Sequence, residues 1–251
     1  MSWASKRKFR YIGVTSSIIL VILIVSAFFI LYIPPTCQDG EMNQEEDGID
    51  CGGPCLTVCG FEIINPIIHW SRVSKMMEGV YSATALIENP NVSAEAYAVP
   101  YILKLYDDEG LLVTEHISEV FIPANKTFPI FSGGINVGNR LPTKVTFEFT
   151  RSPNWLETAP DPEVFIENIQ SFEKNGLPRV SATISNNSVY NIENVEVVVL
   201  LLDNQDNLIN SSKTFIDVIK KDSSEEVVFT WPAPFDKEVT KINIFPVSKL
   251  K

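Results

Sequence analysis

The chain has 251 residues, and its 20 basic and 31 acidic side chains give a net charge of −11. This acidic balance argues against a nucleic-acid-binding protein, because such a protein needs a basic face to contact phosphates. A hydrophobic content of 45% is enough for one or two folded domains with real cores.

Residues 11–33 form an apolar segment without a charged side chain, and residues 1–10 before it carry Lys6, Arg7, Lys8 and Arg10. A helix of this segment is about 34 Å long at about 1.5 Å per residue, which is enough to cross a bilayer. The alternative is a cleaved signal peptide, but signal cores are shorter and end at a small-residue cleavage site. We therefore expect an uncleaved transmembrane helix in the cell membrane. The basic residues 1–10 lie in the cytoplasm and the remaining domains are extracytoplasmic.

Residues 34–60 are expected to form a cysteine-rich acidic neck. All cysteines of the chain lie there, at Cys37, Cys51, Cys55 and Cys59. An even number of cysteines outside the cytoplasm, in a segment with little core, predicts two disulfides, and three pairings stay open. A thiolate metal site and a redox-active or intermolecular pair are the alternatives. The spacing of the cysteines differs from the usual C-x2-C of zinc sites, and no histidine lies near.

Four oxygen-bearing side chains of the neck are candidate calcium ligands: Asp39, Asn43, Glu46 and Asp50. They recur at steps of four, three and four residues. Calcium takes about six to eight oxygen ligands, which carboxylates, amides and backbone carbonyls supply. The alternative is a solvated acidic loop that is held by disulfides and in which the glycines serve turns. The sequence therefore offers calcium as the one cofactor to test.

The rest of the chain contains an internal repeat, in which residues 80–131 resemble residues 180–229. Ser82-Ala83-Thr84 matches Ser181-Ala182-Thr183, and Leu105-Tyr106-Asp107 matches Leu201-Leu202-Asp203. Each copy has the size of a domain, so this is a duplication and not a solenoid of short units.

Both copies are predicted to be β. Apolar residues alternate with polar ones around residues 101–106 and 145–150, as in half-buried strands. Residues 195–202 are almost entirely apolar, which predicts a central strand buried on both faces. Short strands separated by turns are typical of β-sandwiches. We therefore expect a mainly β protein: β-sandwich 1 at residues 61–150, a proline-containing linker at 151–162, and β-sandwich 2 at 163–251.

Asn89-Pro90-Asn91 followed by Leu105-Tyr106-Asp107 resembles the FxLYD-type, immunoglobulin-like sandwich domain. The second copy keeps Leu-Leu-Asp and lacks the Asn-Pro-Asn. From Lys6 onward the whole chain also resembles a group of single-pass bacterial envelope proteins with a D-C-G-G cysteine loop and tandem sandwiches. The neck itself resembles the D-G-x-x-N-x-x-E-x-G-x-D-C-G-G-x-C loops of bacterial surface proteins. These resemblances imply architecture and location, and no activity.

Motifs of the common catalytic sites are not found in the sequence, and its two histidines, His69 and His116, are far apart in the chain. We expect a binding or structural module that contacts an envelope protein or a glycan, for which Trp70, Trp155 and Trp231 are candidate sugar platforms. One alternative is an accessory subunit of a secretion, pilus or respiratory complex, in which the membrane helix is itself an interface. An enzyme on a β scaffold is the other alternative.

Overall fold

The computed structural model describes residues 3–31, 36–158 and 164–248. The end of the apolar segment at residues 32–33, the first residues of the neck at 34–35 and the last residues of the linker at 159–162 therefore lie outside the described residues. The chain divides into two compact units, residues 1–55 and 56–251, which we describe separately. The fold class expected from the sequence is confirmed, because the chain combines one N-terminal apolar helix with β-sheets that pack as sandwiches.

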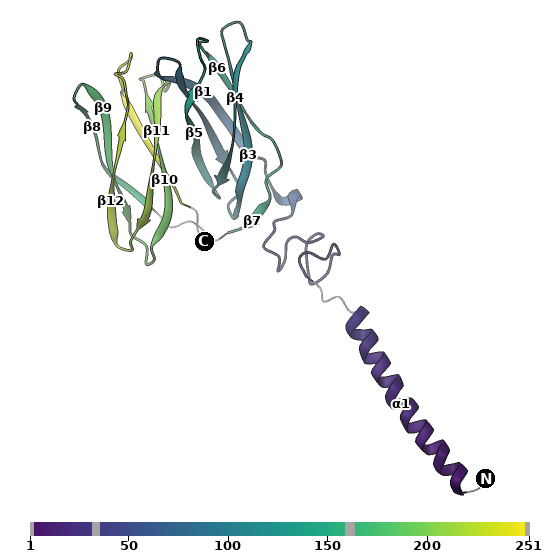
Figure 1. The fold of residues 1–251 in the computed structure, drawn as a ribbon. Coiled ribbons are helices and arrows are strands. Elements are labelled where there is room, and N and C mark those ends of the chain that lie inside the picture. Colours follow the sequence, from purple (N-terminus) through teal and green to yellow (C-terminus); the bar gives the residue numbers. More distant parts are fainter. Residues whose placement is uncertain (1–2, 32–35, 159–163, 249–251) are drawn as a thin grey trace. The chain divides into compact units, whose positions relative to one another are not determined.

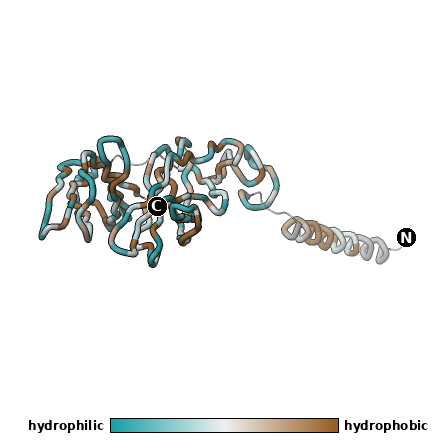
Figure 2. Tube along the Cα trace, turned by 90° about the horizontal axis from the view of Figure 1, so that it is seen from above, coloured by the Kyte–Doolittle hydropathy of each residue, from teal (hydrophilic) through white to brown (hydrophobic). Residues whose placement is uncertain are grey.

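The helix α1 spans Trp3–Leu31, so it includes most of the basic flank as well as the apolar segment. Its stretch Tyr11–Phe29 is long and apolar enough to cross a membrane, and every side chain of this stretch is exposed. Figure 2 shows this stretch as the brown part of the helix. An isolated helix that is apolar on all sides needs an apolar surrounding, which a bilayer or a partner helix supplies.

The second unit contains thirteen strands and one short 3-10 helix in the described part of the chain (Figure 1). The elements are η1 (Gly60–Glu62), β1 (Ile67–Met77), β2 (Val80–Asn89), β3 (Ala94–Tyr106), β4 (Leu112–Ile122), β5 (Lys126–Asn136), β6 (Lys144–Phe149), β7 (Trp155–Glu157), β8 (Val164–Lys174), β9 (Leu177–Asn186), β10 (Ile192–Leu202), β11 (Leu208–Ile219), β12 (Ser223–Thr230) and β13 (Lys241–Ser248).

The two copies of the repeat have the same topology. In sandwich 1 (β1–β7) the sheets have the orders β1-β2-β5 and β4-β3-β6, and in sandwich 2 (β8–β13) they have the orders β8-β9-β12 and β11-β10-β13. All paired strands are antiparallel. Each sandwich has its own core, formed by the alternating inward residues of its two sheets.

The same turn follows the central strand in both copies. Asp107 accepts the backbone N–H of Leu111 at 2.8 Å, and Asp203 accepts the backbone N–H of Asn207 at 2.8 Å. An aspartate at the start of a turn stabilises it through such bonds to its own backbone a few residues on. The Leu-Tyr-Asp and Leu-Leu-Asp motifs are therefore structural.

A buried asparagine also recurs at the end of β2 and of β9. Asn89 donates to the carbonyls of Ala94 and Pro123, both at 2.8 Å. Asn186 donates to the carbonyls of Tyr190 and Ile219 at 2.9 and 3.0 Å. It therefore makes in the second copy the kind of contacts that Asn89 makes in the first, although the sequence Asn-Pro-Asn is not kept there. Each side chain satisfies carbonyls from two chain segments that are buried together.

The two sandwiches pack against each other through the sheets β1-β2-β5 and β11-β10-β13. Strand β10 is buried on both faces, as predicted: one face belongs to the core of sandwich 2, and Val198, Leu200 and Leu202 on the other face pack against sandwich 1. Their neighbours there include Trp70 and Leu86. The four sheets thus form a stack of layers (Figure 1).

Polar contacts accompany this apolar interface. The hydroxyl groups of Thr84 and Ser211 lie 2.7 Å apart in a buried position. Asn210 donates to the carbonyl of Lys75 at 3.1 Å, and Arg72 donates to the carbonyl of Asp206 at 2.7 Å. The sandwiches are therefore held as one body by burial and by hydrogen bonds, and the linker is not their sole connection.

Two expected boundaries differ from the structure. Trp155–Glu157, expected in the linker, form β7, which pairs with β3. Residues 56–58, expected in the neck, belong to sandwich 1, because Val58 donates to the carbonyl of Trp155 at 3.0 Å and Glu157 donates to that of Leu56 at 2.7 Å. These backbone groups find partners only when both segments join the sheet, and this long-range pairing decides where the sandwich ends.

Candidate functional site

The neck is cross-linked, as the cysteine count predicted. Cys37 and Cys55 form a disulfide, and Cys51 and Cys59 are likewise disulfide-bonded. No cysteine in the structure is a free thiol. The alternative of a thiolate metal site is therefore wrong, because a sulfur within a disulfide has no thiolate charge to offer a metal.

The carboxylates of the neck are engaged with backbone N–H groups. Asp39 accepts N–H groups of Thr36 and Glu41 and the side-chain amide of Asn43, all at 2.9 Å. The pKa of Asp39 lies below its ordinary value, chiefly because of the bond from Asn43 and then the bonds from the two backbone groups. Asp50 accepts the N–H of Gly40, at 3.0 Å to one oxygen and 3.2 Å to the other. These hydrogen bonds hold the loop in its conformation, because the neck has too few apolar residues to form a core.

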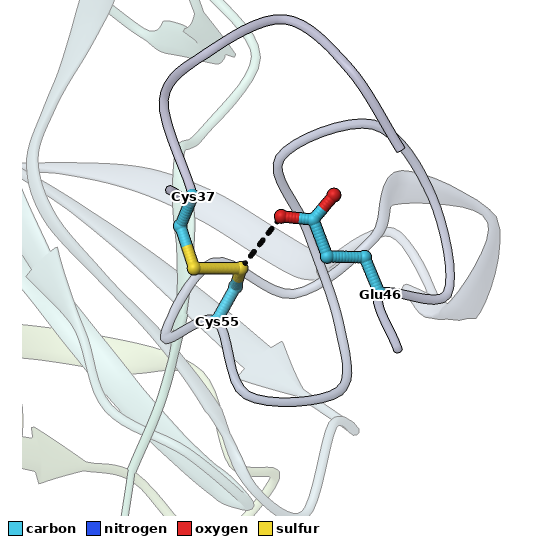
Figure 3. A group of neighbouring side chains, drawn as sticks. All are labelled: Cys37, Glu46 and Cys55. Carbon is cyan, nitrogen blue, oxygen red and sulfur yellow. Dashed lines mark hydrogen bonds between the residues drawn. A yellow bond between two sulfur atoms is a disulfide. The ribbon is translucent and has the colours of Figure 1, made fainter. Parts of the chain in front are cut away.

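Glu46 is the buried acid of the neck, with 5% of its surface exposed. One carboxylate oxygen accepts the N–H groups of Asn43 and Asp50 at 3.2 and 3.3 Å. The other lies 3.1 Å from Sγ of Cys55 (Figure 3). Because that sulfur is in the disulfide and has no hydrogen, we interpret this as a close sulfur–oxygen contact and not as a hydrogen bond. Glu46 thus joins the two turns of the neck beside the Cys37–Cys55 bridge.

The glycine pair of the D-C-G-G sequence is required by the fold of the neck. Gly52 and Gly53 have φ angles of +71° and +56°. A Cβ on Gly52 would overlap the carboxylate of Asp47, and one on Gly53 would overlap the carbonyl oxygen of Glu45. Asp47 also accepts the N–H of Gly53 at 2.8 Å. Side chains are excluded here by both backbone conformation and space. Sequence reasoning singled out the glycines but assigned no role to Asp47.

The four residues expected to bind calcium lie in one loop and offer the oxygen chemistry that calcium prefers. They are Asp39, Asn43, Glu46 and Asp50. The side-chain oxygen of Asn43 is buried without a hydrogen-bond partner among the described residues. The three carboxylates, however, are directed at backbone N–H groups.

Within the described ranges, the group of potential ligand atoms that converges within 4.8 Å is formed by Cys37, Glu46 and Cys55. Two of these are disulfide sulfurs, so the group is not a metal site. The arrangement therefore fits a hydrogen-bonded loop better than a formed calcium cage.

The two histidines lie apart, on different sheets. His69 on β1 is exposed and lies 2.8 Å from the carboxylate of Glu88. His116 on β4 lines a cleft beside sandwich 2. The two residues share neither a sheet nor a site.

The tryptophans do not form a common platform. Trp155 and Trp231 are buried at 6% and 3% exposure, and Trp70 packs at the interface between the sandwiches. Trp155, which was expected in the linker, fills the core of sandwich 1 because β7 joins the sheet.

Comparisons with known proteins add little to this site. No family model matches the chain, and no curated protein matches it. Among solved structures, red sea bream transglutaminase is similar with a TM-score of 0.26 and 10% sequence identity. The alignment covers 74% of this chain and 29% of that protein.

Proposed function

We propose that the chain is a membrane-anchored, extracytoplasmic binding or structural protein, which presents its two packed sandwiches to a partner in the cell envelope. The observation that carries this proposal is the order of the parts: an apolar helix, a cross-linked neck, and then two sandwiches joined as one body. Disulfides indicate an oxidising compartment, so the neck and the sandwiches lie outside the cytoplasm.

The orientation follows from the basic flank. The four basic residues before Tyr11 stay in the cytoplasm by the positive-inside rule, which places the C-terminus outside. The apolar stretch Tyr11–Phe29 exceeds the usual length of a signal-peptide core, which supports an uncleaved anchor.

The neck acts in this proposal as a compact spacer, stabilised by its disulfides and by carboxylates that accept backbone N–H groups.

Calcium at Asp39, Asn43, Glu46 and Asp50 would neutralise clustered acids and stiffen the spacer further. Titration calorimetry of calcium into the oxidised full chain in detergent micelles tests this. Heat that Asp39→Ala and Asp50→Ala abolish, and that Glu41→Ala, an exposed control in the same loop, retains, would support calcium at these residues. No heat with the unmodified chain would contradict calcium binding.

Anchoring and orientation are tested together. The exposed Val189 (83%) is replaced by Cys and labelled with a membrane-impermeant maleimide in intact cells, and a Ser5→Cys variant serves as the control. We expect the Val189 variant to react in intact cells and the Ser5 variant to react only after lysis. A membrane-extracted chain whose intact mass lacks residues 1–33 would contradict the uncleaved anchor.

The partner is sought by cross-linking in native membranes. Adducts formed through the sandwiches support the proposed surface module. An adduct formed through α1 with one stoichiometric partner favours instead an accessory subunit of a membrane complex, because the exposed apolar helix would then be the interface.

A further inference from the structure

A cleft of about 490 Å³ is lined by residues of both sandwiches. Its lining includes six consecutive residues of β5, from Phe128 to Gly133. Side chains of a strand alternate between two faces, so consecutive residues line a cavity only where the edge of the strand borders it. The free edge of β5 is therefore part of the wall of this cavity, which we call the β5 cleft.

The edge of β5 has no strand beside it within the described residues. Strand β5 pairs with β2 on one side, and β4, which also lines the cleft, pairs with β3 alone. No backbone hydrogen bond from residues 128–133 to a loop is found in the described part of the chain. Phe128, Pro129, Ile130 and Ser132 of this edge are buried, whereas Phe131 is half-buried and Gly133 is exposed. Backbone groups are therefore open to pairing with another chain only around residues 131–133.

Along β10 and along β4, the side chains on one face change from apolar to polar where the strand reaches the cleft. On β10 the outward residues Val198, Leu200 and Leu202 are buried against sandwich 1, whereas Glu196 lines the cleft. On β4 the inward residue Val120 packs on the core, whereas Ser118 and His116 line the cleft on the same face. Polar residues at positions that would otherwise face a core indicate a surface kept open to solvent or to a ligand.

The opposite wall combines an aromatic side chain with charged groups. Phe215 of sandwich 2 is 54% exposed and faces the cleft. Lys213 pairs with Glu196 at 3.2 Å, and the side chain of Glu119 on β4 forms no hydrogen bond or ion pair in the parts of the chain that the structure describes. The cleft therefore has an uncompensated carboxylate at its rim and an apolar surface within it.

We propose that the β5 cleft binds an extended peptide segment of the partner protein, which adds to the sheet as a strand beside β5. This inference rests on the proposed binding function and names its site and ligand class. The backbone of the peptide pairs with the free edge around residues 131–133, an apolar side chain packs on Phe215, and a basic side chain pairs with Glu119 at the rim. Pro129 has no N–H, so it limits pairing to a short segment and opposes edge-to-edge association of whole sheets.

The test uses the oxidised full chain in detergent micelles and a phage-displayed library of short linear peptides as the probe. Peptides selected on the unmodified chain are then measured by fluorescence anisotropy against matched variants. Ser118→Trp fills the cleft, whereas Val189→Trp places the same side chain at a position that is 83% exposed and does not line the cleft. We expect Ser118→Trp to weaken binding about tenfold or more and Val189→Trp to leave it unchanged.

Two further measurements keep the result decisive if Ser118→Trp perturbs folding. Phe215→Glu alters an exposed side chain on the opposite wall, and we expect it to weaken binding as well. Hydrogen exchange of the complex should show added protection of the β5 amides around residues 131–133, where the edge is not buried. Selected peptides that bind Ser118→Trp and Phe215→Glu as tightly as the unmodified chain would overturn the proposal. So would cleft-dependent binding of glycans on an array without any peptide binding.

Failure of this inference is distinguishable from failure of the proposed function. If no linear peptide binds but sandwich-directed cross-links form in native membranes and persist in Ser118→Trp, the cleft is not the site and the surface module stands. If no sandwich-directed cross-link forms at all, the proposed function itself fails.

Discussion

The two sandwiches have one topology but different outer faces, and this difference determines how they meet. In sandwich 2 the outward residues of the central strand β10 are Val198, Leu200 and Leu202, which are buried against sandwich 1. At the corresponding positions of β3 the repeat has Ile102, Lys104 and Tyr106, on a face that no sheet covers within the described residues. A lysine in this row makes the face unsuited to burial.

The contact between the copies is heterologous: the β1-β2-β5 sheet of one copy meets the β11-β10-β13 sheet of the other. A contact of this kind does not close on itself, so further copies can in principle add at both ends. Both open ends carry charged side chains. Lys104 and Glu148 form an ion pair at 3.2 Å on one end, and Glu226 lies on the exposed face of β12 on the other, although β8 there also exposes Phe165 and Phe172. As in repeat proteins, charged groups on the end faces oppose the addition of further copies.

The largest effect is expected when a residue on the buried face of β10 is replaced by the residue at the corresponding position of β3. Leu200→Lys places an unpaired charge between the sandwiches, where Leu200 is 1% exposed. We expect a loss of about 3–5 kcal/mol in the free energy of unfolding, or separation of the sandwiches. Denaturant unfolding and small-angle scattering measure the two outcomes. An unchanged stability together with an unchanged radius of gyration would show that this interface does not hold the copies together.

The recurring asparagines provide the second test of the comparison. Asn89→Ala and Asn186→Ala each leave buried carbonyls without donors, so we expect each to lower the free energy of unfolding by about 1–3 kcal/mol. Similar losses in denaturant unfolding would show that Asn186 performs the role of Asn89. A loss for Asn89→Ala alone would mean that the second copy no longer depends on this bridge.

These contacts also show what the sequence could and could not predict. The apolar run of β10 predicted burial on both faces, because so few polar side chains leave no face for solvent. The face of β2 that sandwich 2 covers carries Ser82 and Thr84, which are 0% and 1% exposed. Small hydroxyl side chains suit a solvent face equally well, and the partner of Thr84, Ser211, lies more than a hundred residues away. The packing of the sandwiches was therefore not predictable from local pattern.

In the neck, the even number of cysteines predicted the disulfides, because the count depends on no geometry. The role of the acids was not predictable in the same way. The same acidic residues at the same spacing can bind calcium or accept backbone N–H groups. Only the conformation of the loop distinguishes these two roles. The positive φ of Asp50, at 56°, directs its backbone so that its side chain meets Gly40, and no sequence pattern specifies this angle.

The reciprocal substitution on β3 should change association more than stability. Lys104→Leu removes an ion pair that is partly exposed, so we expect less than about 1 kcal/mol of change in the free energy of unfolding. With a leucine between Ile102 and Tyr106, the row would resemble the buried face of β10, and we expect concentration-dependent self-association. Sedimentation velocity detects it. The control Lys213→Leu removes the corresponding kind of ion pair at Glu196 on sandwich 2. Equal association of both variants would attribute the effect to lost charge and not to this face.

The smallest effect is expected from acid, at the turn that follows β10. Asp203 accepts N–H groups of Asn207 and Gln205 at 2.8 and 2.9 Å, and its pKa is lowered chiefly by the bond from the backbone of Asn207. A folded-state pKa below the unfolded value of about 3.9 means that the stabilisation is complete above that pH. It is lost as the pH falls through the lower folded value.

Asp203→Asn removes this titration, so the decline of the unfolding free energy below about pH 4 should become shallower than in the unmodified chain. Denaturant unfolding at a series of pH values measures the slope. Asp217→Asn, which changes the charge equally at an exposed position of β11, is the control and should keep the original slope. Parallel profiles for all three chains would show that the turn bonds of Asp203 do not favour its ionised form. The aspartate of the Leu-Leu-Asp motif would then stabilise the turn by its geometry alone, independently of its charge.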